Sequence, residues 1–138
     1  MKLEISITQE ILNRSAMCNN DYGQNCAIGL AIADIFGKHS WVGENTWCTN
    51  NKPINFCITI YEKAWDDLSS SVIIAEIELP KEANDFIKKF DNVSSDHRRK
   101  MTPFAFEIDI PNSVIEMISL EEIYKVLETS TCLKLVET

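Results

Sequence analysis

Apolar and polar residues alternate along four stretches of the chain, and this two-residue period is typical of strands with one buried face. The alternating stretches are residues 2–8, 54–60, 72–79 and 104–110. A short strand is also expected within residues 40–52, and a last strand over residues 132–136. The pattern thus predicts a sheet whose outward face carries the polar residues of each strand.

A three- and four-residue spacing of apolar positions predicts helices between these strands. Thr8 can cap a helix over residues 9–16, and an apolar stripe from 83 to 90 follows Pro80. Near the end of the chain, Asn112 can cap a helical turn, and the sequence Ser-Leu-Glu-Glu at 119–122 is a capping box. Residues 91–100 show no period and are predicted to be an irregular loop.

The most apolar stretch is GQNCAIGLAIADIFG, residues 23–37. Its apolar residues cover nearly every side of a helix, so this helix is expected at the centre of the fold. Asn25 can cap its start, and Gly37 is placed to end it. The order of strands and helices lacks a regular strand–helix–strand repeat. The fold class predicted is α+β, a single domain over residues 1–138 with a mainly antiparallel sheet and helices packed largely on one face.

Composition narrows the possible partners. The 138 residues are 45% hydrophobic and 25% charged, with a formal net charge of −8. Such a chain is expected to repel duplex nucleic acid and anionic membranes. No apolar run is long enough to cross a bilayer, and the N-terminus lacks the apolar block of a signal peptide. We therefore expect a cytoplasmic protein.

Cysteine chemistry gives one candidate nucleophile. The five cysteines show no metal-binding spacing, so reduced thiols without metal or other cofactor are expected. Cys26 would open the central helix, where the helix dipole favours a thiolate. Gln24 could stabilise an oxyanion, and His97 is the downstream base candidate. The surrounding apolar residues favour a buried structural cysteine over this arrangement.

Other candidate sites carry charge or aromatic rings. Arg98, Arg99 and Lys100 form a basic cluster that could hold phosphates, although a solvated loop explains it as well. Trp41, Trp47 and Trp65 could stack on a base or anchor a protein partner, or could simply anchor loops.

Pairs of carboxylates stand two residues apart on the predicted strands, at 76 and 78 and at 107 and 109. Such pairs could bind a metal, but an acidic outward face is ordinary in a chain of this charge.

Two segments resemble a family of small proteins encoded by bacteria and their phages. The segment NCAIGLAIADIFG (25–37) is similar to a helix of that family, with Ala27 at a position where proline is usual. The segments IELPKEANDFIKKFD (77–91) and MTPFAFEIDIP (101–111) are similar to a second segment of the same proteins. No activity is assigned to the family. The resemblance implies a phage-borne accessory protein, in which residues 112–138 are a C-terminal helix–strand addition.

Three functions stay open. The first is a non-enzymatic binding protein that inhibits or sequesters a component of bacterial antiviral defence, either a host protein with a basic groove or a small nucleotide signal. The second is a cysteine-dependent hydrolase or transferase using Cys26. The third is a structural accessory protein of a mobile element. Assembly into a homo-oligomer is compatible with each.

Overall fold

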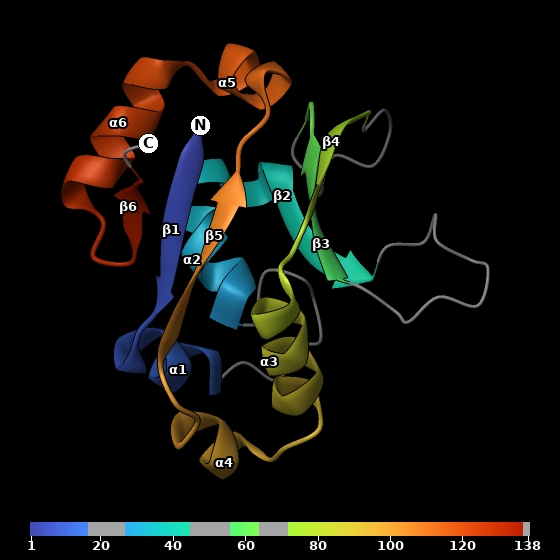
Figure 1. Cartoon of the computed structure of the whole chain (residues 1–138), viewed down its shortest axis with the longest axis vertical. Helices are drawn as coiled ribbons and strands as arrows, with labels where there is room; N and C mark the ends of the chain where they lie inside the picture. Colours follow the sequence, from blue (N-terminus) through green and yellow to red (C-terminus); the bar gives the residue numbers. More distant parts are fainter. Residues whose placement is uncertain (17–26, 45–55, 64–71, 137–138) are drawn as a thin grey trace.

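Two antiparallel three-stranded sheets form the framework of the computed structural model, which describes residues 1–16, 27–44, 56–63 and 72–136. One sheet has the order β5-β1-β6 and the other the order β2-β3-β4 (Figure 1). The strands are β1 (Lys2–Ile7), β2 (Ser40–Glu44), β3 (Phe56–Tyr61), β4 (Ile73–Glu78), β5 (Phe104–Asp109) and β6 (Leu133–Leu135).

Helices lie behind and around the two sheets (Figure 1). They are α1 (Gln9–Ala16), α2 (Ala27–Phe36), the 3-10 turn η1 (Gly37–His39), α3 (Lys81–Asp91), α4 (Ser95–Arg99), α5 (Asn112–Ile118) and α6 (Leu120–Thr129). The prediction of a single α+β domain with antiparallel strands is confirmed, although the strands divide between two small sheets. Within the described residues, no helix combines the length and the apolar character needed to cross a membrane.

Strand β1 shows why the alternation of apolar and polar residues predicts a strand with one buried face. Leu3, Ile5 and Ile7 are each 1% exposed, whereas the residues between them are only partly buried. The side chains opposite them on β5 are also apolar, so the inner face of this sheet is continuous core. A register slip of one residue would turn this whole apolar set to solvent.

Helix α2 lies at the centre of the core, as its apolar sequence predicts. It packs against both β1 and β2, and Ile28 and Ile32 are fully buried. Gly37 follows the helix with a φ of +53°, a conformation that glycine adopts without steric cost. The predicted helix end at Gly37 is confirmed.

Helix α3 joins the two sheets through aromatic and polar contacts. The ring of Phe86 lies 4.9 Å from that of Phe104 on β5, measured between centroids. The buried Asn84 amide accepts from the Phe56 N–H at 2.6 Å and donates to the Leu79 carbonyl at 2.8 Å. Asn84 thereby supplies a side-chain bridge at the point where β3 and β4 end.

The prediction of an irregular loop over residues 91–100 is wrong. Helix α3 continues to Asp91, and α4 forms one further short helix. The Arg98 N–H donates to the Ser94 carbonyl at 2.9 Å, which closes a helical turn. A helix of five residues is too short to display an apolar period. It is held by the Arg98 side chain and by contacts with α1, including the Gln9 amide, which donates to the Arg99 carbonyl at 2.7 Å.

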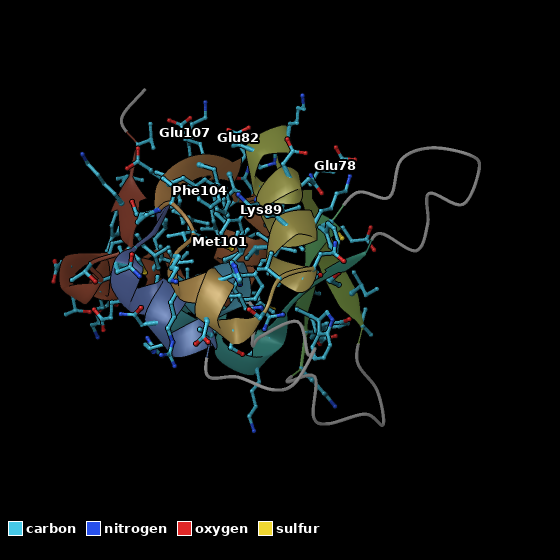
Figure 2. All side chains as sticks on the ribbon, turned by 90° about the horizontal axis from the view of Figure 1, so that it is seen from below. Glu78, Glu82, Lys89, Met101, Phe104 and Glu107 are labelled. Atoms are coloured by element: carbon cyan, nitrogen blue, oxygen red, sulfur yellow. The ribbon has the colours of Figure 1, made fainter. Side chains whose placement is uncertain are left out.

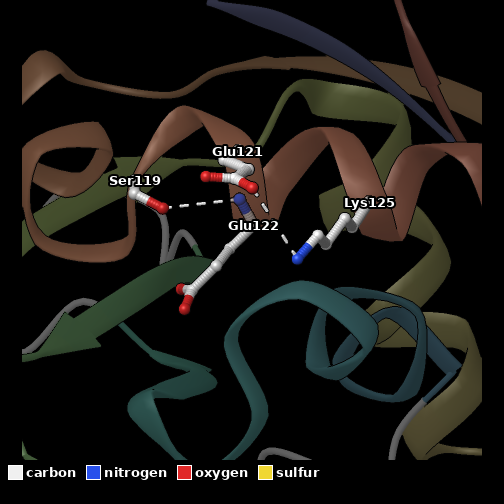
Figure 3. A network of polar contacts seen from close by, with 4 residues as sticks. All are labelled: Ser119, Glu121, Glu122 and Lys125. Carbon is white, nitrogen blue, oxygen red and sulfur yellow. Dashed lines mark hydrogen bonds and ion pairs between the residues drawn. The ribbon is translucent and has the colours of Figure 1, made fainter.

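Helix α6 begins at the predicted cap. The Ser119 hydroxyl accepts from the Glu122 N–H at 3.4 Å, and the Lys125 ammonium lies 3.8 Å from the Glu121 carboxylate (Figure 3). Ser119 has a φ of 76° and a ψ of 142°, a region that is strained for a residue with a Cβ atom. The tight connection between α5 and α6 therefore imposes a strained backbone on its capping residue.

Two substitutions of Ser119 distinguish the energetic cost of its strained backbone from the contribution of its capping hydrogen bond. A Ser119→Gly variant should gain about 1 kcal/mol in unfolding free energy, because the relief of strain exceeds the few tenths lost with the cap. A Ser119→Ala variant keeps the strain and loses the cap, so it should lose about 1 kcal/mol. Urea denaturation of both variants measures whether the unfolding free energy rises or falls in each. Equal losses in both would contradict the strained backbone.

Candidate functional site

Strands β4 and β5 lie side by side as the facing edges of the two sheets without pairing (Figure 1). A surface groove of about 440 Å³ runs between them. We call this the edge groove, defined by its lining residues Glu76, Ile77, Glu78, Leu79, Pro80, Glu107, Ile108, Asp109 and Pro111. Its volume lies within the range of small ligand sites.

Carboxylates from both strands surround the edge groove. Glu76 and Glu78 come from β4, and Glu107 and Asp109 from β5; all four are exposed. Within the described part of the chain, none of the four makes an ion pair. Figure 2 shows Glu78 and Glu107 on the same side of the molecule as Glu82 of α3. The groove is thus acidic, with Lys2 of β1 directly opposite Asp109 at its margin.

The neighbouring strand adds to this charge. Glu107 stands directly opposite Glu4 on β1, and like charges at such positions destabilise a sheet. A second hollow beside the groove is lined by both residues, together with Lys134, Leu135 and Val136. On the other side of β1, Lys134 of β6 stands directly opposite Glu4, so a lysine lies next to this acidic pair.

Backbone groups also face the edge groove. The Ile110 N–H donates to the Met1 carbonyl at 2.7 Å. Counting back along β5 from Ile110, every second residue directs its backbone N–H and C=O groups toward β1. Glu107 and Asp109 therefore occupy positions whose N–H and C=O groups point away from β1.

The same alternation applies to β4. The Leu79 N–H donates to the Phe56 carbonyl at 3.3 Å, which makes Glu76 and Glu78 the residues whose backbone groups point away from β3. Within the described residues, the four positions that supply the carboxylates thus also direct backbone groups away from their own sheets.

A metal ion is a poor fit to these carboxylates. Among the residues that the structure describes, no three His, Cys, Asp or Glu side chains come close enough to hold one. The four acidic side chains are spread along two strands instead of converging on one point. This arrangement suits a ligand whose positive charges are also spread out.

Trp41 lies on the outward face of the second sheet. A Cβ atom built on Gly43 would come within 3.2 Å of the Trp41 indole nitrogen, so the indole covers this glycine. On the neighbouring strand β3, burial raises the pKa of the Tyr61 phenol, and electrostatic interaction with Cys57 and Glu76 raises that pKa further. The outward face of this sheet is therefore aromatic on one side and acidic toward the groove.

The basic cluster has two distinct parts. The Arg98 guanidinium lies 4.3 Å from the centroid of the Phe90 ring, and its Nε donates to the Phe90 carbonyl at 2.9 Å. Arg98 therefore packs on Phe90, and its role in holding phosphates stays a prediction. Arg99 and Lys100 are exposed.

The structure does not bring this cluster to Trp41. Helix α4 packs against α1, whereas Trp41 belongs to β2 on the other sheet (Figure 1). The basic cluster and Trp41 thus lie on different parts of the described structure, and the binding role of each stays a prediction. Trp47 and Trp65 lie outside the described residues.

The predicted cysteine site is described only in part. Cys26 and Gln24 lie outside the described residues, so the nucleophile hypothesis stays a prediction. His97 is exposed on α4, with its Nδ1 2.8 Å from the Ser94 hydroxyl. Of the described cysteines, Cys57 and Cys132 are both buried, and burial raises the pKa of the Cys132 thiol.

Comparisons of the chain with protein-family models, with curated proteins and with solved structures found no match. The geometry of the edge groove is therefore the basis for a functional proposal.

Proposed function

We propose that the protein is a non-enzymatic binding protein that engages a basic partner through the edge groove. The observation that carries this proposal is the set of four exposed carboxylates around one hollow, none of them in an ion pair within the described residues. A concave site lined by one sign of charge concentrates its field and attracts the opposite charge.

The partner class follows from this charge. Anionic ligands such as nucleotides are repelled by the edge groove, and Arg98 of the basic cluster is engaged with Phe90. A host protein with a basic surface, such as the groove of a nucleic-acid-binding protein, is complementary to it. The setting, a phage-borne inhibitor of bacterial antiviral defence, is part of the proposal and is supported by the family resemblance alone.

Retention of a partner from bacterial lysate tests the proposal. The tagged wild-type protein should retain a basic protein at about 50 mM salt and release it by about 300 mM, since complementary charges are screened over this range. A groove variant with Glu76→Gln, Glu78→Gln, Glu107→Gln and Asp109→Asn should retain at least about tenfold less, a loss of roughly 1.4 kcal/mol. Quantitative mass spectrometry measures both.

A matched variant controls for net charge. It carries Glu10→Gln, Glu121→Gln, Glu122→Gln and Glu128→Gln, four exposed positions on α1 and α6. This control variant has the same net charge as the groove variant and should retain the partner like wild type. Retention that resists salt, or that falls equally in the two variants, would contradict binding through the edge groove.

A further inference from the structure

We infer that the edge groove takes an extended polypeptide strand, which pairs with the free edge of β5 and places basic side chains at alternate positions. This inference rests on the proposed function and specifies the shape of the partner. The observation behind it is that the groove offers backbone hydrogen-bonding groups and carboxylates from the same residues.

Strand β5 has the regular edge that strand addition requires. It pairs with β1 over six consecutive residues without a shift, whereas the β3–β4 ladder carries an irregularity at Ile60 and Tyr61. Glu107 and Asp109 direct their N–H and C=O groups to the side where an added strand would lie. An exposed edge of this kind is a template for pairing with another chain.

The spacing of the carboxylates matches such a strand. Residues two apart on a strand are about 6.8 Å apart along its axis and point to the same face. Glu107 and Asp109 therefore meet alternate residues of an added strand, and Glu76 and Glu78 face the same ligand from β4. Lysine or arginine at those alternate positions would place its charge among the four carboxylates.

The remaining side chains of the strand would face inward. Ile77, Leu79 and Ile108 line the groove between the carboxylates, and each is at most 6% exposed. Apolar residues between the basic ones are complementary to these side chains. A second copy of this chain is a poor occupant, because its own β4 and β5 would bring further carboxylates to the same place.

Synthetic peptides separate strand addition from simple charge attraction. The probe is a seven-residue peptide of alternating lysine and valine, with blocked ends. In antiparallel pairing with β5, the lysine opposite Glu107 presents its backbone N–H to β5, while the valine N–H groups point away. Methylation of the lysine amide nitrogens should weaken binding at least about tenfold, whereas methylation of the valine amides should change it less than about threefold. Isothermal titration at low salt measures the three affinities.

A backbone variant tests the same edge from the protein side. Glu107→Pro and Glu107→Gln both remove the carboxylate, but only proline removes the N–H that faces the groove. Because this N–H has no partner on β1, proline is compatible with the ladder. The proline variant should bind the parent peptide at least about tenfold more weakly than the glutamine variant.

The outcomes distinguish this inference from the proposed function. Equal binding of the parent and both methylated peptides, lost together in the groove variant, would overturn strand addition and leave the acidic binding site intact. Absence of binding by every peptide would also overturn strand addition, and the lysate experiment then decides the proposed function separately. If Glu107→Pro fails to fold, as judged by circular dichroism, the methylated peptides alone decide.

Discussion

An Asn84→Leu variant is expected to lose about 2–5 kcal/mol of unfolding free energy, because it leaves two backbone groups without their partner. The Asn84 side chain is 7% exposed and accepts from the Phe56 N–H at 2.6 Å. Its Nδ2 donates to the carbonyls of Leu79 and Pro80 at 2.8 and 3.2 Å. Leucine has a similar volume, so the loss should come from the missing hydrogen bonds and not from a cavity. Urea denaturation followed by circular dichroism measures it.

Asn92 offers a matched control on the same helix. Its Nδ2 also donates to a backbone carbonyl, that of Lys88 at 2.6 Å, but the pair is exposed. Water can replace the amide there, so Asn92→Leu should change the unfolding free energy by less than about 0.5 kcal/mol. A loss below about 1 kcal/mol in Asn84→Leu would mean that water reaches the Phe56 N–H and Leu79 carbonyl in the folded protein.

The position of Asn84 illustrates what periodicity cannot predict. The stripe Ala83, Phe86, Ile87 and Phe90 predicts which face of α3 is buried, and these four side chains are buried. Asn84 lies beside that stripe and is polar, so the apolar pattern gives no sign that it is buried. Its role depends on where β3 and β4 end in space, and single-sequence patterns do not contain that information.

The edge groove is a second feature that the sequence pattern alone does not predict. The alternation of β4 and β5 correctly places Glu76, Glu78, Glu107 and Asp109 on outward faces. Whether two strands of separate sheets face one another depends on how helices such as α2, which contacts both sheets, pack against them, and no local pattern encodes this packing. The sequence therefore predicts two acidic strands, and only the fold brings them to one groove.

A run of basic residues in a predicted loop suggests solvent exposure, which makes Arg98 a candidate ligand-binding residue. Its anchoring on Phe90 arises from a turn of α4 that follows α3 closely. A long side chain can place its charged end at the surface and still pack its stem on an aromatic ring. The run of basic residues therefore does not predict that Arg98 packs on Phe90, eight positions earlier.

An Ile58→Ala variant is expected to lose about 3–4 kcal/mol of unfolding free energy, because it removes a fully buried side chain from the middle of β3. Ile58 is directly opposite Val42 on β2 and Ile77 on β4, so the cavity would lie between all three strands of the sheet. Ile58→Val removes a single methyl group and should cost about 0.5–1.5 kcal/mol.

The neighbouring position provides the control, because alternation turns Thr59 to the outward face. Thr59→Ala should cost less than about 1 kcal/mol, since Thr59 is only partly buried and adds little to the core. Ile58→Ala should still bind the groove's partner in proportion to its folded fraction, because the four carboxylates of the edge groove stay in place. Equal losses of stability at 58 and 59 would contradict the assigned faces of β3. A selective loss of binding in fully folded Ile58→Ala would show instead that the groove depends on the packing beneath β4.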